Sequence, residues 1–112
     1  MPDISKGMKS LDNILSGKQE RLVGLCRQYH VRQLDIFGSA AGGGFDPAAS
    51  DLDLLVEFGA AEDLNRADQY FGFLEALETL FGRAVDLVQH SAIRNPYFAQ
   101  QIQATRVLLY AA

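Results

Sequence analysis

The segment from residues 52 to 58, LDLLVEF, limits the fold of this 112-residue chain more than any other. Every second residue in it is apolar, and successive side chains of a β-strand point to opposite faces of a sheet. One face of such a strand has to be buried, whereas the other begins with two carboxylates, Asp51 and Asp53. The apolar face comprises Leu52, Leu54, Val56 and Phe58, and the second face continues with Leu55 and Glu57.

The length and composition indicate one globular domain. A chain of 112 residues is of ordinary size for a domain and buries roughly two thirds of its unfolded surface. Apolar residues make up 48% and charged residues 21%, as in globular rather than disordered proteins. We therefore expect a single domain over residues 1–112, in which the polar residues 1–15 form a loose N-terminal arm.

Charge and apolar patterning exclude several classes of function. The net charge of −4 provides no electrostatic attraction to DNA or RNA, so we expect no direct nucleic-acid partner. No apolar run approaches 18 residues, which predicts no membrane association. Cys26 is the single cysteine, so neither an internal disulfide nor a thiolate metal cluster can form. Together these features predict a cytoplasmic protein.

Apolar periodicity and capping residues predict the other elements. One helix is expected to begin after Asp63 or Asn65, either of which could cap it, and to end at Phe81 before Gly82. Its buried stripe would comprise Ala67, Phe71, Leu74, Leu77 and Phe81. Residues 106–110 either continue the last helix or form a short strand. The remaining elements are a helix over 16–29, strands over 32–37 and 84–88, a short helix after Ser39, and a helix over 96–104.

These elements predict an α+β fold in which the helices pack on one face of a small sheet. That arrangement buries all the apolar stripes at once. Asp51, Asp53 and Asp86 would then lie on the opposite, open face, because Asp86 stands between two apolar residues of its strand. Three carboxylates on one exposed face need a functional explanation.

The three carboxylates are close enough on such a sheet to share a ligand. Same-face residues of one strand are roughly 6.6 Å apart, and neighbouring strands are roughly 4.8 Å apart. Unpaired carboxylates at this spacing repel each other, and a divalent cation removes the repulsion. Oxygen ligands favour Mg²⁺ or Mn²⁺, and two such ions about 4 Å apart are the usual arrangement for displacement at phosphorus. We therefore expect Asp51, Asp53 and Asp86 to bind two Mg²⁺ ions.

A Gly-Ser pair provides a place for phosphate groups. Gly38 and Ser39 follow the strand over 32–37, where a turn into a short helix exposes backbone N–H groups. Gly38 lets a phosphate approach without a Cβ atom in its path, and the Ser39 hydroxyl can donate a hydrogen bond. Each pattern alone also suits a solvated turn, but their combination with Asp86 predicts a nucleotide site.

With these motifs the chain resembles the minimal nucleotidyltransferases of the DNA polymerase β-like superfamily. Their signature is a Gly-Ser pair, a linker of about ten residues, Asp-x-Asp, and a third Asp on a later strand. The matching residues are Gly38-Ser39, Asp51-Leu52-Asp53 and Asp86, with the flanking segments LDIFGS, SDLDLLVEF and NPYFAQQI. The match covers residues 22–110 and implies the small mixed sheet of that superfamily.

Members of this size are commonly antitoxins paired with a HEPN-domain RNase toxin, and the resemblance implies such a partner here. Some of them transfer AMP from ATP to a tyrosine of the toxin, which silences it. The implied roles are metal binding by Asp51 and Asp53, deprotonation of the acceptor hydroxyl by Asp86, and triphosphate binding by Gly38 and Ser39. ATP would be the substrate and Mg²⁺ the cofactor.

The loop after the Gly-Ser pair departs from the family pattern. The family reads Gly-Ser-Arg-Ala-Arg-Gly, whereas this chain has Ala40 and Gly42 in place of the two arginines. Their loss removes charge-assisted contacts that could bind phosphate or an acidic partner. The candidates to replace those contacts are Arg66, Arg83 and Arg94, each of which also suits a solvated surface.

Two other functions remain open. The missing arginines are compatible with a catalytically weak or inactive binding module that neutralises its partner by complex formation. The other is transfer of the nucleotide to a small molecule or to RNA, although the chain lacks a second domain to bind such an acceptor.

For a protein partner we expect an exposed apolar surface, with the aromatic residues of the helix over 65–81 as the candidate. His90 is interpreted as a loop residue rather than a general base.

Overall fold

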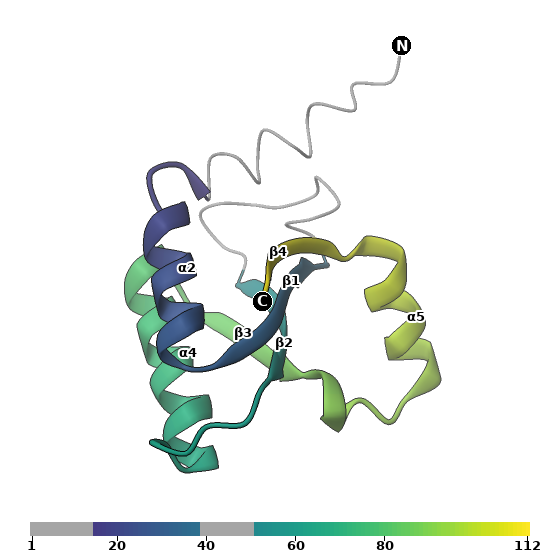
Figure 1. The fold of residues 1–112 in the computed structure, drawn as a ribbon. Coiled ribbons are helices and arrows are strands. Elements are labelled where there is room, and N and C mark those ends of the chain that lie inside the picture. Colours follow the sequence, from purple (N-terminus) through teal and green to yellow (C-terminus); the bar gives the residue numbers. More distant parts are fainter. Residues whose placement is uncertain (1–14, 39–50) are drawn as a thin grey trace.

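The computed structural model describes residues 15–38 and 51–112 (Figure 1). The three predicted strands are confirmed to within one residue, and the first helix begins later than predicted. Apart from Leu15, the predicted arm lies outside the described ranges, as does the short helix after Ser39. The elements are α2 (Gln19–Gln28), β1 (Val31–Phe37), β2 (Leu52–Phe58), α4 (Arg66–Phe81), β3 (Val85–Gln89), the 3₁₀ helix η1 (His90–Ala92), α5 (Pro96–Thr105) and β4 (Val107–Ala111).

The strands form one mixed sheet in the order β3-β2-β1-β4. Strand β1 is antiparallel to β2 and β4, whereas β2 and β3 are parallel. A parallel pair needs a long crossover connection, and the 16-residue helix α4 provides it. Residues 107–111 pair with β1, so the segment that could have continued the last helix is an edge strand.

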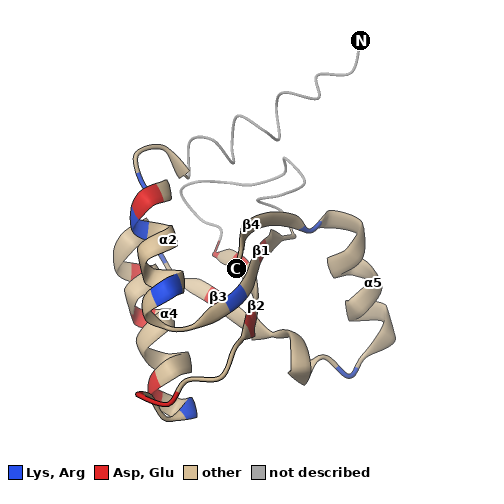
Figure 2. Ribbon diagram, viewed as in Figure 1, with Lys and Arg blue, Asp and Glu red and all other residues tan. Residues whose placement is uncertain are grey.

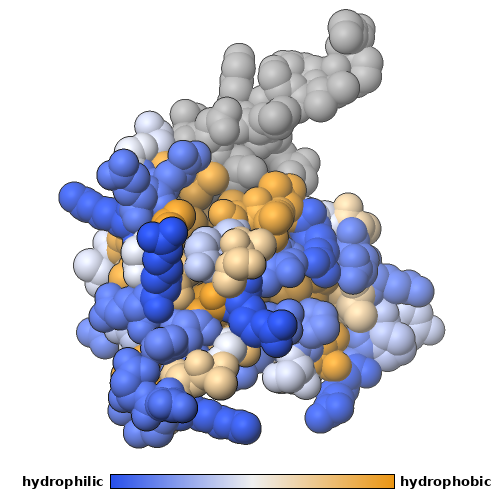
Figure 3. All heavy atoms as spheres, in the orientation of Figure 1, coloured by the Kyte–Doolittle hydropathy of each residue, from blue (hydrophilic) through white to orange (hydrophobic). Residues whose placement is uncertain are grey.

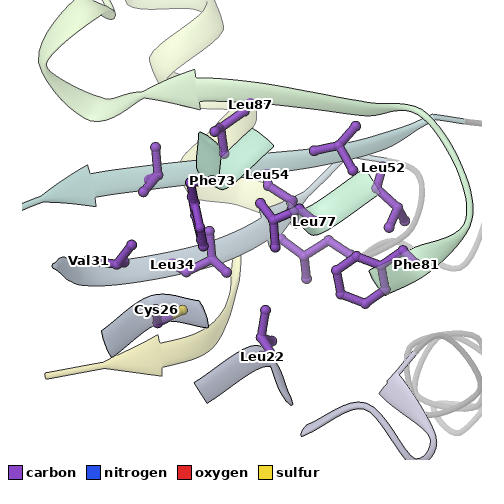
Figure 4. Packing of buried hydrophobic residues seen from close by; sticks show 13 residues of the cluster. Leu22, Cys26, Val31, Leu34, Leu52, Leu54, Phe73, Leu77, Phe81 and Leu87 are labelled. Atoms are coloured by element: carbon purple, nitrogen blue, oxygen red, sulfur yellow. The ribbon is translucent and has the colours of Figure 1, made fainter. Parts of the chain in front are cut away.

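The main core lies between one face of the sheet and the helices α2 and α4 (Figures 1 and 4). The apolar face predicted for residues 52–58 is confirmed, because Leu52, Leu54 and Val56 are fully buried. Leu22 and Cys26 of α2 belong to the same cluster. Each buried Leu or Val contributes roughly 1.5–3 kcal/mol, so this layer fixes which way β2 faces. The alternate residues of β2 are therefore directed to the other side of the sheet.

The face of α4 that meets the core is partly the predicted one, because Leu77 and Phe81 are buried as expected. Phe73 is fully buried, whereas Phe71, which the apolar stripe assigned to the core, is 63% exposed. Gln69 accounts for part of the difference, because its Nε2 donates to the carbonyl oxygens of Tyr29 and Gly59 from a buried position. A stripe drawn from apolar residues alone misses a buried polar residue of this kind.

The two ends of α4 follow the capping rules. Asn65 is the N-cap residue, and its Oδ1 accepts a hydrogen bond from the N–H of Asp68 at 2.8 Å. The other candidate cap, Asp63, instead pairs with Nε2 of His30 at 2.8 Å. Gly82 follows the helix with φ 66°, as predicted for a left-handed C-terminal residue.

Helix α5 packs on the face of the sheet opposite α2 and α4 (Figure 1). Phe98 and Ile102 join Phe37 and Leu55 in a second, smaller apolar cluster. The rings of Phe37 and Phe98 meet edge to face, with their centroids 6.0 Å apart. The expectation that the helices pack on one face is thus correct for α2 and α4 and wrong for α5. Phe37 and Leu55 give the second face an apolar area that needs cover.

The visible surface is mostly hydrophilic, with apolar residues near its centre (Figure 3). None of the described helices is both long and apolar enough to cross a bilayer. The exposed large apolar side chains in the described ranges are Phe71, Tyr97, Val107 and Leu108. They belong to α4, α5 and β4, so apolar surface occurs on both sides of the sheet.

Candidate active site

Asp53 and Asp86 lie directly opposite each other on the parallel strands β2 and β3. Residues paired across neighbouring strands point to the same face, so both side chains project to the side that α5 partly covers. Both stand near the N-terminal ends of their strands. Asp51 precedes β2 and is exposed. The structure thus places Asp53 and Asp86 at one end of one sheet face, and Asp51 comes just before that end of β2 in the chain.

The surroundings of Asp53 favour its protonated form. Partial burial raises the pKa of the Asp53 carboxyl above its usual value of 3.8, and the negative charges of Asp86 and Asp51 raise it further. Burial and the two neighbouring carboxylates thus disfavour the negative charge of Asp53. A bound cation would compensate it.

The three carboxylates are not gathered as a ligand set. Within residues 15–38 and 51–112, no three acidic, histidine or cysteine side chains converge in a geometry that could bind a metal ion. Mutual repulsion keeps unpaired carboxylates apart, so a cation would have to draw them together. Their chemistry nevertheless fits Mg²⁺ or Mn²⁺, because every donor is an oxygen atom and the charge of Asp53 is uncompensated.

Gly38 directly adjoins the Asp53 carboxylate. Its backbone is left-handed, with φ 74°, and a Cβ atom built on it would lie 2.6 Å from Oδ2 of Asp53. The glycine was expected to leave a path for phosphate, but the neighbouring space is occupied by Asp53. The N–H of Gly38 donates to Oγ1 of Thr105 at 3.0 Å, so it is not free for a phosphate oxygen. The predicted phosphate ligand Ser39 lies outside the described residues.

A cavity of about 400 Å³ opens between this end of the sheet and α5. Two carboxylates stand on its sheet side. Helix α5, on the other side, carries no charged residue (Figure 2). The sequence did not identify the residues of α5, because nothing in NPYFAQQI indicates which sheet face the helix covers. The lining residues are Phe37, Gly38, Asp53, Asp86, Phe98, Gln101, Ala104 and Thr105.

The arginines proposed to replace the missing loop contacts do not line this cavity. Arg66, Arg83 and Arg94 are all absent from its wall. Arg66 instead lines a separate cleft with His90, at the opposite, C-terminal ends of β2 and β3. Among the described residues, the cavity therefore has two carboxylates and no cationic side chain.

A buried ion pair on the same sheet face was not predicted from the sequence. Asp35 is 1% exposed, and its Oδ2 lies 2.8 Å from Nε of Arg106. The Nε2 of Gln33 lies 3.2 and 3.3 Å from the two carboxylate oxygens. The pair joins β1 to the residue that follows α5. The available signal was one charged residue in the otherwise apolar segment LDIF.

Comparison with known proteins identifies the family of the chain. The family model described as nucleotidyltransferase domain matches residues 20–109. The chain is 34% identical over 96 residues to a candidate protein adenylyltransferase of Methanocaldococcus jannaschii, covering 86% of this chain and 94% of that protein. It is 30% identical over 88 residues to the protein adenylyltransferase MntA of Thermococcus cleftensis, covering 79% of this chain and 82% of that protein.

Solved structures show the same fold. A candidate minimal nucleotidyltransferase matches with a TM-score of 0.66 at 30% identity, over 83% of this chain and 90% of that one. A chain from the complex of a tri-AMPylated Shewanella oneidensis HEPN toxin with its MNT antitoxin matches with a TM-score of 0.56. The latter match covers 85% of this chain and 71% of that one, and at 20% identity it establishes the fold alone.

Proposed function

Because the chain belongs to the nucleotidyltransferase domain family, we propose that it is a Mg²⁺-dependent enzyme that transfers AMP from ATP to a tyrosine of a HEPN-type toxin. It would act in the cytoplasm as the antitoxin of that pair. The observation that carries the proposal is the pairing of Asp53 with Asp86 beside Gly38, in the wall of one cavity. The relatives named protein adenylyltransferases and the tri-AMPylated toxin complex support the choice of substrate and partner.

In the proposed reaction the acidic residues bind metal ions, and one of them also accepts a proton. Asp51, Asp53 and Asp86 would bind two Mg²⁺ ions, which when bound supply positive charge at the triphosphate and the acceptor oxygen. Asp86 accepts the proton of the acceptor hydroxyl. The acceptor oxygen then forms a bond to the α-phosphorus, and the bond from that phosphorus to pyrophosphate breaks. Gly38 makes room for Asp53, which leaves Ser39 as the residue of this turn that would bind the triphosphate.

The acceptor has to approach from the side of the sheet that carries Asp53 and Asp86. Tyr97 of α5 is 78% exposed and Leu108 of β4 is 57% exposed. Leu108 pairs with Asp35 across the sheet, so it points to the same face as the carboxylates. Phe71 of α4, the surface expected from the sequence, belongs to a helix on the other side. A partner that presents a tyrosine to the cavity would therefore contact α5 and β4.

Label transfer from radiolabelled ATP to a purified HEPN-type toxin would test the proposal. The wild-type protein should transfer label when Mg²⁺ is present and not when EDTA replaces it. Asp53→Asn should lower the transfer rate at least about a hundredfold, because it removes charge at the reacting phosphate. Asp63→Asn makes the same chemical change on the exposed surface and should leave the rate unchanged. Transfer by Asp53→Asn at the wild-type rate would refute the catalytic assignment.

One observation favours a second function, neutralisation by occlusion without catalysis. No cationic side chain of the described residues lines the cavity, although nucleotide sites commonly use one to bind phosphate. A double variant, Asp51→Asn with Asp53→Asn, separates the two functions. Full neutralisation of the toxin by this variant, with no AMP on the partner, would establish occlusion. Loss of neutralisation, with the complex still formed, would support AMP transfer.

A further inference from the structure

We infer that Thr105 is a positioning residue for Gly38 and, through it, for Asp53 in the candidate site, an inference that rests on the proposed function. Thr105 is the last residue of α5 and one of the residues that line the cavity. Its hydroxyl oxygen accepts the N–H of Gly38 at 3.0 Å. The two residues are 67 positions apart in the sequence, so this bond connects the end of the last helix to Gly38, the residue that follows β1.

The hydroxyl of Thr105 is oriented by a second hydrogen bond. It donates its proton to the carbonyl oxygen of Gln101, one helical turn earlier, at 2.9 Å. Because the proton is committed to that carbonyl, the oxygen presents lone pairs to the N–H of Gly38. The acceptor is thus fixed in direction as well as in place.

Helix α5 provides a rigid base for this contact. Phe98 and Ile102 pack in the apolar cluster with Phe37. Arg106, the residue after Thr105, is bound to the buried carboxylate of Asp35. Arg106 therefore contacts the buried middle of β1, and Thr105 contacts the residue just past the end of this strand. A shift of Thr105 would have to break one of these attachments.

The position of Gly38 matters because of what adjoins it. Its left-handed backbone lies against the carboxylate of Asp53, so displacement of Gly38 changes the space available to Asp53. Thr105 thereby acts on the acidic part of the site, through Gly38, without contacting the nucleotide's reacting atoms.

The test is MgATP binding by the full chain, measured by calorimetry. Thr105→Val keeps the branched shape and removes the acceptor, and it should weaken binding about three- to tenfold, the usual worth of one neutral hydrogen bond. Thr105→Ser restores the hydroxyl and should recover most of the affinity. Thr79→Val makes the same change on the exposed face of α4 and should bind as the wild type does.

A second measurement reports on the contact itself. The amide hydrogen of Gly38 should exchange faster with solvent in Thr105→Val than in the wild type or in Thr105→Ser. Equal MgATP affinity and equal Gly38 exchange in Thr105→Val would overturn this inference and leave the proposed function intact. Absence of MgATP binding by the wild-type protein would overturn the proposed function and this inference with it.

Discussion

At the residue scale, the carboxylate of Asp53 occupies the space that a side chain at position 38 would need, and the backbone of Gly38 is left-handed. A Cβ atom would lie 2.6 Å from Oδ2 of Asp53, and φ is 74°. Left-handed backbone costs a non-glycine residue roughly 1–2 kcal/mol before any clash is counted. We expect Gly38→Ala to lower the free energy of unfolding by about 2 kcal/mol, measured by urea denaturation, and to weaken MgATP binding.

Gly24 provides the matched control for this prediction. It lies within α2, and a Cβ atom there would meet no other atom within 4 Å. Gly24→Ala should therefore raise the free energy of unfolding by roughly 0.5–1 kcal/mol, because alanine favours helix. A Gly38→Ala variant as stable as the wild type would show that position 38 tolerates a side chain and that the contact with Asp53 is loose.

Asp53 is expected to lower the stability of the protein in the absence of a cation. Its pKa is raised by burial and then by Asp86 and Asp51. Protonation therefore favours the folded state: the stabilisation is complete below pH 3.8 and is lost as the pH rises through the raised pKa. Asp53→Asn should increase the melting temperature at pH 7 in EDTA, and the increase should become smaller as the pH is lowered.

Addition of Mg²⁺ and a surface variant provide the controls for this prediction. Mg²⁺ that binds the folded wild-type protein should raise its melting temperature and reduce the advantage of Asp53→Asn. Asp63→Asn, on the exposed surface, should show no such dependence on Mg²⁺. A lower melting temperature for Asp53→Asn in EDTA would mean that the carboxylate is compensated by groups other than a metal ion.

At the element scale, the junction of α5 and β4 is fixed to β1 by the Asp35–Arg106 pair. Removing Arg106 leaves the buried carboxylate of Asp35 without its cationic partner, which typically costs roughly 3 kcal/mol. Arg106→Met should therefore reduce the free energy of unfolding by about that amount in urea denaturation. The double variant Asp35→Leu with Arg106→Met should recover most of the loss, because two apolar residues can pack where the ion pair was.

The exposed Arg32–Glu57 pair is the control for this effect. Its atoms are 3.9 Å apart and both side chains are largely solvated, so Arg32→Met should change stability by less than about 0.5 kcal/mol. If Arg106→Met proved equally mild, solvent would be reaching Asp35. In that case the pair would not be the attachment that keeps the end of α5 in place.

The elements themselves could largely be predicted from the sequence, because strand and helix periodicities are local properties. The cap at Asn65 and the left-handed Gly82 belong to the same local chemistry. Burial of Leu77 and Phe81 on α4 could be predicted from apolar spacing, but burial of Gln69 could not, since it depends on hydrogen bonds to carbonyls distant in the chain. The side of the sheet that α5 covers depends on tertiary packing of Phe37 with Phe98, for which apolar periodicity provides no sign.

Part of the candidate site could likewise be predicted from the sequence, and part could not. Asp53 and Asp86 could be assigned to one face because alternation along each strand fixes the direction of its side chains. The reason for glycine at position 38 and the contact with Thr105 could not, because both depend on residues far away in the sequence.

At the scale of the whole molecule, the sheet separates the main core from the candidate active site. Helices α2 and α4 cover the core side, and α5 forms one wall of the cavity on the other side (Figure 1). An acceptor protein that is modified must reach the second side. A partner that is neutralised by binding alone, without being modified, does not have to reach that side.

The exposed apolar residues distinguish these two modes of binding. If AMP transfer requires docking beside the cavity, Tyr97→Ser and Leu108→Ser should each weaken partner binding about tenfold or more, as at an interface hot spot. Phe71→Ser should have little effect, because α4 covers the opposite face. Isothermal calorimetry with the partner would measure all three. A strong effect of Phe71→Ser alone would support the α4 surface and neutralisation without transfer.

The central claim, that Asp51, Asp53 and Asp86 form a divalent-cation site beside Gly38, is tested most directly by Mn²⁺ titration followed by amide NMR. Paramagnetic Mn²⁺ broadens the signals of nearby residues. The wild-type protein should lose the signals of Asp53, Asp86 and Gly38 first, and Asp53→Asn should require much more Mn²⁺ for the same loss. Broadening that begins elsewhere on the surface, with these three signals unaffected, would contradict the claim.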